Sequence, residues 1–280
     1  FNRLKKEPFG KTKTEIKGRK VDIIVVGGGP AGMMAAISAR QTNKTAEVLL
    51  IEKNEKLGKK LFITGKGRGN LTNSCEEEQF FSHFLRNPRF IYPAFRALSN
   101  RDLMDFIEKN GCALKEERGG RIFPVSDKAY SLTDALKSAL KKYAVKVECN
   151  QTLKVIKRKE EGFLCRIGNK EIDTKKLILA TGGLSYPSTG STGDGYRFAK
   201  ELSIPVTKLY PSLVKMEVLE EDIFSLSGLK LKHIVASVED EKGKVYGKKT
   251  GELYFQKDSV FGPTVLSLSA ELSPAIHESP

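Results

Sequence analysis

The sequence predicts an α/β fold in which helices cover a parallel sheet. Three neighbouring features support this: the apolar run "VDIIVV" (Val21–Val26), the glycine cluster after it, and a second apolar run, "AEVLLIEK" (Ala46–Lys53). An uninterrupted, β-branched apolar run is typical of a parallel strand that is buried on both faces. The segment between the glycines and the second run has the pattern of a helix, so these features together form a βαβ unit.

The glycine cluster predicts a site for a pyrophosphate. Gly27, Gly29 and Gly32 have the G-x-G-x-x-G spacing, and Pro30 and Ala31 open the following helix. The first glycine makes the tight turn, the second lets the backbone approach a pyrophosphate, and the third lets the helix pack closely on the strand. The N–H groups and positive dipole end of the helix favour a phosphate there. We therefore expect these five residues to contact a dinucleotide.

An acidic residue completes the unit. Glu52 ends the second apolar run, about 20 positions after Gly32, where an acid reaches the ribose hydroxyls of an adenosine half. The alternative is a structural turn with an unrelated glutamate, but the whole order of strand, turn, helix, strand and acid favours dinucleotide binding. We place Glu52, and Lys53 beside it, in the cofactor site.

The later chain extends this domain. The segment "SLTDALKSALKKYAVKVEC" (Ser131–Cys149) predicts a helix with Leu132, Ala135, Leu136 and Leu140 on one face, followed by a strand.

Residues 152–183 indicate which dinucleotide is bound. They predict a small antiparallel meander with a turn at Gly162, which leads into an apolar strand that ends at Ala180. A meander, a strand and then "ATGG" are the layout of FAD-binding folds of the glutathione-reductase type. Glycines at such a strand end leave room for a backbone to pass close to the cofactor. The residues expected at FAD here are Thr181, Gly182 and Gly183.

The composition argues against several classes of protein. With 280 residues, of which 39% are hydrophobic, the chain can bury one large core or two smaller ones. It has no apolar segment of about 20 residues, as a membrane span needs, and its first residues lack the apolar centre of a signal peptide. The four cysteines are widely spaced, so we expect reduced thiols and a cytoplasmic protein. His83 and His233 have no Cys, Asp or Glu at ligand spacing, so we expect no metal site.

The formal net charge of +14 has two interpretations. Residues 1–20 form a basic tail with eight Lys or Arg and two Glu. The remaining excess fits either a nucleic-acid surface or a lysine-rich exterior that attracts phosphate-bearing ligands. Because the basic residues are scattered and are not interleaved with aromatic residues, we expect weak nucleic-acid binding.

Four ordered motifs carry a family resemblance. They are "GKKLFITGKGRGNLTN" (Gly58–Asn73), "GGRIFPVSDKA" (Gly119–Ala129), "LILATGGLSYPSTGSTGDGYRFAKELS" (Leu177–Ser203) and "GELYFQKDSVFGPTVLSLSA" (Gly251–Ala270). With them the chain resembles the bacterial NAD(P)/FAD-dependent oxidoreductases of the aminoacetone-oxidase type, a group that includes a bile-acid reductase. The resemblance implies a glutathione-reductase-type, Rossmann-like FAD domain over residues 21–203, with an inserted, mostly β second domain from residue 204 to 280.

The chain departs from that family in three places. Lys66 and Gly69 stand in "GKGRGN" where the family usually has "GGGRCN", so a thiol near the flavin is absent. Lys257 and Phe261 stand where a histidine and a serine are common in "FTHxGxSGP", which argues against an acid or base role there. The family closes the flavin half with a C-terminal strand and glycine-rich turn, and the sequence stops at Pro280 before such a segment. We therefore expect the C-terminal part of the fold to be missing.

Five further residues of these motifs are candidates for cofactor contacts. Lys60 and Arg68 would meet phosphate or flavin charge, with a solvated surface as the alternative for Lys60. Asn70 and Thr72 supply polar groups nearby, and Asp194 would cap a helix that begins one residue later.

These features predict an FAD-dependent oxidoreductase that exchanges a hydride between flavin and a small organic substrate, with NAD(P)H or oxygen as the second partner. Tyr186 is a candidate proton donor, with a packed or surface tyrosine as the alternative, and we assign no catalytic side chain. One rival is an RNA-associated flavoprotein of the tRNA-modifying type, which commonly has a histidine in the glycine cluster where this chain has Pro30. Another is a flavin-binding remnant without turnover. No feature indicates an oligomeric state.

Overall fold

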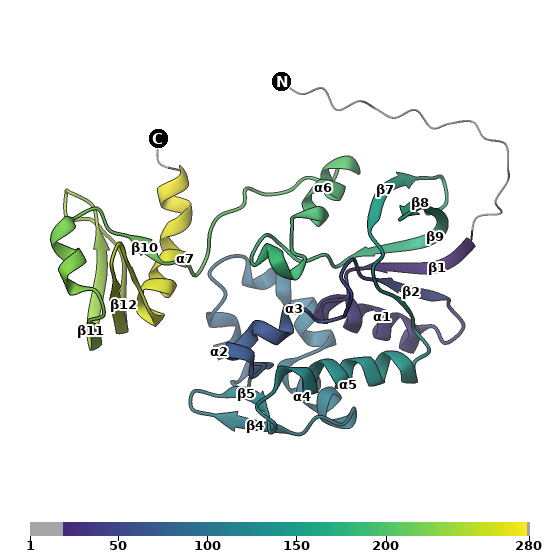
Figure 1. The fold of residues 1–280 in the computed structure, drawn as a ribbon, viewed down its shortest axis with the longest axis horizontal. Coiled ribbons are helices and arrows are strands. Elements are labelled where there is room, and N and C mark those ends of the chain that lie inside the picture. Colours follow the sequence, from purple (N-terminus) through teal and green to yellow (C-terminus); the bar gives the residue numbers. More distant parts are fainter. Residues whose placement is uncertain (1–18, 279–280) are drawn as a thin grey trace. The chain divides into compact units, whose positions relative to one another are not determined.

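The computed structural model describes residues 19–278 (Figure 1). Most of the predicted basic tail, residues 1–18, lies outside the described residues, but Arg19 and Lys20 are the first residues of strand β1. The chain forms two compact units. The first contains the residues up to Glu76 together with Pro93–Val206, and the second contains Glu77–Tyr92 together with the residues from Thr207 onward.

A six-stranded sheet organises the first unit. Its strand order is β6-β2-β1-β9-β8-β7. The first three neighbouring pairs are parallel and the last two are antiparallel. The strands are β1 (Arg19–Val26), β2 (Val48–Ile51), β6 (Lys146–Glu148), β7 (Leu153–Arg158), β8 (Phe163–Ile167) and β9 (Lys170–Leu179). The predicted α/β class and Rossmann-type sheet are confirmed.

Helices cover both faces of the parallel strands. Val25 and Leu50 point into one buried cluster with helices α1 (Pro30–Thr42) and α5 (Ala129–Lys142). Ile24 and Leu49 point into a second cluster that contains Phe198 of α6 (Asp194–Glu201). Figure 1 shows α1 and α5 on one side of the sheet and α6 on the other. This double burial explains why the first two strands read as continuous apolar runs.

The predicted face of α5 is correct. Its four predicted core residues are all buried: Leu132, Ala135, Leu136 and Leu140. The strand expected after this helix is β6, which pairs with β2.

The third strand of the meander and the apolar strand after it are one element. The β7–β8 hairpin turns at Gly162, as predicted, and a Cβ there would lie 2.2 Å from the Thr174 carbonyl oxygen. β9 pairs antiparallel with β8 and parallel with β1, and it ends at Leu179, one residue before the predicted end. The ten-residue strand β9 is therefore both the third strand of the meander and the apolar strand expected after it.

Smaller elements complete the first unit. A three-stranded antiparallel sheet has the order β3-β5-β4. Helix α3 (Pro88–Ala97) is divided between the units: its residues up to Tyr92 belong to the second unit, and those from Pro93 onward belong to the first. The remaining elements are η1 (Leu61–Gly67), β3 (Thr72–Asn73), α4 (Asn100–Lys109), β4 (Leu114–Glu117), β5 (Arg121–Pro124) and η2 (Pro187–Thr189).

The second unit is built on a separate antiparallel sheet, with the order β10-β13-β12-β11. Helix α7 packs on β12, where Lys249 Nζ lies 2.5 Å from Glu271 Oε1. Lys257, at the position where the family has a histidine, is exposed in the turn between β12 and β13. The elements are α2 (Glu77–Ser82), β10 (Met216–Glu217), η3 (Glu221–Leu226), β11 (Lys230–Glu239), β12 (Val245–Gln256), β13 (Ser259–Phe261) and α7 (Pro263–Glu278).

Two kinds of feature are absent from the described chain. None of the helices within residues 19–278 combines the length and apolarity that crossing a membrane requires. The same residues contain no group of three or more His, Cys, Asp or Glu side chains that could hold a metal ion.

Candidate functional site

A cavity of about 560 Å³ lies at the carboxyl ends of three neighbouring strands of the first unit. Val26, Ile51 and Leu179, the last residues of β1, β2 and β9, all line it. The chain leaves β1 toward β2 on one side, while β9 occupies the other side, so this is the point where the strand order reverses. Open α/β sheets bind their ligands at such a point.

The three motif glycines have different surroundings. Gly27 has φ +108°, and a Cβ there would lie 2.4 Å from the Ala180 carbonyl oxygen. A Cβ on Gly32 would lie 1.8 Å from the Gly27 carbonyl oxygen, because α1 packs directly against the turn. Gly29 is different: no atom lies within 4 Å of its Cβ position, and it lines the cavity. Gly29 is also the N-cap of α1, without a side-chain cap.

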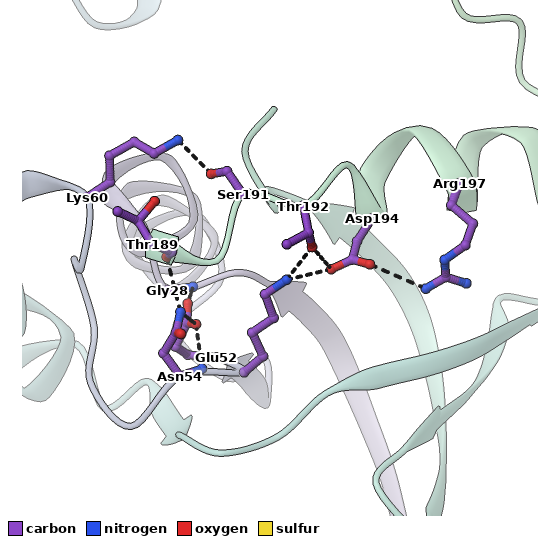
Figure 2. A network of polar contacts seen from close by, with 10 residues as sticks. Gly28, Glu52, Asn54, Lys60, Thr189, Ser191, Thr192, Asp194 and Arg197 are labelled. Atoms are coloured by element: carbon purple, nitrogen blue, oxygen red, sulfur yellow. Dashed lines mark hydrogen bonds and ion pairs between the residues drawn. The ribbon is translucent and has the colours of Figure 1, made fainter. Parts of the chain in front are cut away.

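Glu52 holds the glycine turn as well as lining the cavity. Its side chain is buried, and Oε2 accepts a hydrogen bond from the Gly28 N–H at 2.6 Å. Oε1 accepts from the backbone N–H of Asn54 at 2.8 Å and from its Nδ2 at 2.7 Å (Figure 2). Asn54 Nδ2 also donates to the Thr189 carbonyl, so the acid connects the end of β2 with two loops.

Lys53 and Asp194 form an ion pair on the cavity lining. Lys53 Nζ lies 2.8 Å from Asp194 Oδ2 and 2.7 Å from Thr192 Oγ1. Partial burial raises the pKa of Asp194, but the hydrogen bond and charge of Lys53 outweigh burial, so the pKa is lowered. The prediction that Asp194 caps α6 is wrong: Asp194 is the first helical residue, and the N-cap is Gly193, which has no side-chain bond to give. Gly193 adopts φ +81°, a backbone conformation that favours glycine. Gly193 therefore occupies the N-cap position, and the helix begins at Asp194.

Lys60 reaches the loop after β9. Its Nζ donates to Ser191 Oγ at 2.6 Å and to the Ser185 carbonyl at 2.8 Å. Gly182 has φ +73°, which favours glycine, and a Cβ there would lie 2.5 Å from Ser191 Oγ, so a larger residue would displace this serine. Thr181 and Gly182 line the cavity. Gly183 is not among the lining residues, and the Tyr196 hydroxyl would lie 3.2 Å from its Cβ.

Three predicted cofactor contacts, Arg68, Asn70 and Thr72, are not among the residues that line the cavity. Arg68 forms ion pairs with Glu117 and Asp127 and lies over the Phe123 ring, 4.3 Å from its centroid.

The other two residues pair locally. With its amide turned so that nitrogen faces the carbonyls, Asn70 donates to Thr72 and Ile122 at 3.2 Å. Thr72 pairs with Ile122 in the small sheet. These contacts give the three residues a role in holding the loop that follows η1.

Tyr186 lies in an unusual backbone conformation at the surface. It has φ +52°, precedes η2, and is 66% exposed. It is not among the cavity-lining residues, so its predicted role as a proton donor has no support from this cavity.

Sequence reasoning missed seven polar residues of the lining, which are Asn54, Lys59, Gln151, Thr152, Thr189, Ser191 and Tyr196. Ser191 had a local signal, because it lies within the glycine-rich stretch "STGSTGDG". Gln151 had none: its backbone N–H donates to the Glu52 carbonyl because β6 pairs with β2, which local sequence does not reveal.

The lining fits a dinucleotide. The N-terminus of α1 and the open space at Gly29 suit a pyrophosphate, and Lys53, Lys59 and Lys60 supply positive charge. The cavity volume is also within the range of about 300–1,000 Å³ that is usual for ligand pockets.

The chain is similar to several known proteins. The sequence profile of the HI0933-like protein Rossmann domain family matches residues 21–256. The 3-dehydro-bile acid delta(4,6)-reductase of Clostridium scindens is 28% identical over 254 residues, which are 91% of this chain and 61% of the reductase. The ribosomal RNA dihydrouridine synthase of Haemophilus influenzae is 30% identical over 258 residues, 90% of this chain and 61% of that protein. The chain thus spans about three fifths of the length of these relatives.

A solved structure supports the fold. The FrdA chain of Escherichia coli quinol fumarate reductase is 17% identical and superposes with a TM-score of 0.52, covering 76% of this chain and 43% of that one. The resemblance found in the sequence motifs is confirmed by the profile match, which extends over most of the chain. This protein belongs to the HI0933-like protein Rossmann domain family.

Proposed function

We propose that this chain binds FAD in the cavity of its first unit and is the flavin-binding part of an oxidoreductase. The observation that carries the proposal is the space at Gly29, a residue with no neighbour within 4 Å of its Cβ position at the N-terminus of α1. A backbone free of side chains at a helix N-terminus suits a pyrophosphate, and Lys53, Lys59 and Lys60 line the same cavity.

The chain's own residues would bind and orient the cofactor. The N–H groups at the start of α1 would hold the pyrophosphate, and Glu52 would accept hydrogen bonds from the ribose of the adenosine half. Lys53 and Lys60, which both line the cavity, would balance phosphate charge. When bound, FAD supplies the capacity to accept or deliver a hydride, so the protein needs to contribute binding, orientation and electrostatics.

The two relatives suggest a substrate class. Their names, a delta(4,6)-reductase and a dihydrouridine synthase, both denote the addition of hydrogen to a carbon–carbon double bond. In a 3-oxo steroid nucleus and in a uracil ring, that bond is conjugated with a carbonyl group. We therefore propose that a hydride and a proton are added across such a bond in a small organic substrate. NAD(P)H is the proposed electron donor for this reduction. In the reverse direction, removal of hydrogen from the substrate, oxygen would be the electron acceptor.

RNA is the second candidate substrate. It is favoured by the dihydrouridine synthase relative, which is 30% identical over 90% of this chain. The cytoplasm is the proposed location, supported by the four cysteines, all of which are free thiols.

One series of spectra tests this function. The purified chain should show flavin absorbance, or gain it when FAD is added, and NADH or NADPH should bleach the flavin band without oxygen. A 3-oxo-4-ene steroid or a uridine-containing oligonucleotide should then restore the band. Absence of flavin together with failure to take up FAD would contradict the proposal. Uptake of FAD without reduction by either nucleotide would favour a flavin-binding remnant.

A further inference from the structure

A segment of the second unit combines basic and aromatic side chains. Between Glu78 and Asp102 the sequence has no acidic residue, and it contains "FFSHFLRNPRFIY" (Phe80–Tyr92). Arg86 and Arg89 are exposed in this segment. Phe90 is 82% exposed. The expectation that basic residues are nowhere interleaved with aromatic residues is therefore wrong for this segment.

A second acid-free segment meets the first. No acidic residue occurs between Glu201 and Glu217. Within it, the Tyr210 ring lies 5.1 Å from Arg86 Cζ and 5.4 Å from Lys208 Nζ, measured to the ring centroid. Two basic side chains from distant parts of the sequence thus converge on one aromatic ring, without a carboxylate in either segment.

A packed aromatic layer supports the exposed residues. The rings of Phe81 and Tyr92 stack with centroids 4.1 Å apart and an interplanar angle of 4°, and Phe81 is buried. Phe84 packs 5.6 Å from Phe80. Phe90 stays in solvent although apolar neighbours are close in sequence, and a phenylalanine in water forgoes the favourable burial of its ring. An exposed ring that directly follows an exposed arginine, Arg89, in the sequence is suited to a flat ligand with negative charge.

We propose that the surface formed by Arg86, Arg89, Phe90, Lys208 and Tyr210, here named the Arg–Phe surface, binds single-stranded RNA. The arginines and the lysine would meet phosphates, and an unpaired base would stack on Phe90. Charge complementarity favours a polyanion, and the exposed ring favours bases over a purely electrostatic partner.

The inference rests on RNA, the second candidate substrate of the proposed function, but not on the flavin chemistry. RNA binding by this surface needs neither FAD nor turnover. RNA binding and FAD uptake can therefore be measured separately on the same sample, and either can fail without the other.

The test uses the full chain and a labelled, mixed-sequence RNA of about 12 nucleotides, a length typical of single-strand sites. Fluorescence anisotropy at several salt concentrations gives both the affinity and its salt dependence. Phe90→Ala should weaken binding about tenfold with an unchanged salt slope, because it removes a stacking surface and no charge. The slope of log K against log salt is negative. Arg86→Ala and Arg89→Ala should each make it shallower, by about 0.7 for each phosphate that the arginine no longer neutralises.

A matched control removes an exposed arginine and an exposed aromatic side chain elsewhere. Arg118 and Tyr130 are exposed in the first unit, so the double variant Arg118→Ala/Tyr130→Ala should bind RNA as the parent does. The tail of residues 1–18 is present in every variant, so its electrostatic contribution cancels.

The proposal is overturned if Phe90→Ala binds RNA like the parent, or if the control loses as much affinity as the surface variants. It is also overturned if vesicles of anionic phospholipid displace the RNA and their binding depends on Phe90, since the surface would then be a membrane contact. FAD uptake, measured on the same samples, reports on the flavin proposal alone: absence of RNA binding with normal uptake rejects only the Arg–Phe surface.

Discussion

The backbone N–H of Gly28 donates to Glu52 Oε2 at 2.6 Å, so the acid predicted to bind a ribose also holds the glycine turn. Its other oxygen accepts two hydrogen bonds from Asn54, and the side chain is buried. Glu52→Gln keeps the shape of the side chain but replaces one accepting oxygen with an amide NH₂. One N–H donor then faces another donor and loses its hydrogen bond.

We expect Glu52→Gln to lower the free energy of unfolding by about 1–3 kcal/mol, the cost of a buried unsatisfied donor. Urea unfolding without FAD measures it. The matched control is Glu55→Gln, whose carboxylate is 60% exposed and should be replaceable without effect. Equal stability of the Glu52 variant and the parent would show that the turn does not depend on this acid.

Gly29→Val should separate binding from stability. No atom lies within 4 Å of the Cβ position, so the fold should tolerate the side chain, whereas FAD would meet it at the pyrophosphate. We expect an unchanged melting temperature and at least about a tenfold decrease in FAD affinity, equivalent to about 1.4 kcal/mol. Titration followed by flavin fluorescence measures this decrease. A variant that bound FAD like the parent would remove the main support for the proposed site.

Gly32→Ala should have the opposite effect. Its Cβ would lie 1.8 Å from the Gly27 carbonyl oxygen, so α1 would have to move away from the turn. We expect a decrease of about 1–3 kcal/mol in stability even without FAD, as is usual for overpacking. Thermal unfolding of the apo protein is the measurement, and a melting temperature equal to that of the parent would contradict the close packing described for this turn.

The stability of the protein should depend on pH through Asp194. Because its folded-state pKa is lowered, its contribution is complete above the unfolded pKa of about 4 and disappears as the pH falls through the folded value. The side chain is 29% exposed, so we expect at most about 1 kcal/mol.

The measurement compares unfolding of Asp194→Asn and the parent from pH 6 downward. The difference should be constant above about pH 4 and shrink below it. Asp134→Asn is the control, because that carboxylate is 60% exposed and pairs with Lys137 at the surface. A difference that grew toward low pH would have the wrong sign for a lowered pKa.

The cysteines should differ in reactivity. Burial raises the pKa of Cys165 to about 12, and burial also raises the pKa of Cys112 and Cys149. Since the thiolate is the reactive form, iodoacetamide at neutral pH should modify Cys75 first and leave Cys165 unmodified until the chain unfolds. Peptide mass spectrometry after brief labelling checks this order. Early labelling of Cys165 would mean that the β7–β8–β9 layer opens readily.

The local part of the site could be predicted from sequence. The glycine turn, the helix after it and Glu52 lie within one βαβ unit, whose geometry depends on neighbours in the chain. Gln151 could not be predicted, because its place beside Glu52 results from the pairing of β6 with β2.

Two differences between the predicted and the observed site have specific physical causes. Arg68 was expected at the cofactor, but its charge is satisfied by Glu117 and Asp127, which the small antiparallel sheet and the following loop bring to it. Asp194 was expected as a cap, but the left-handed backbone of Gly193 takes that position. Both follow from contacts or backbone angles that a motif does not specify.

The pairing of β1 with β9 has a consequence for synthesis. Val26 pairs with Leu179, so the second neighbour of β1 is translated long after β1 itself. At roughly 5–20 residues per second, that interval lasts on the order of 10–30 s on the ribosome. Throughout it, the nascent chain carries an apolar strand with one open edge, the kind of template on which chains pair with one another. The yield of folded protein should therefore depend on how well cellular chaperones shield residues 21–26 until β9 emerges.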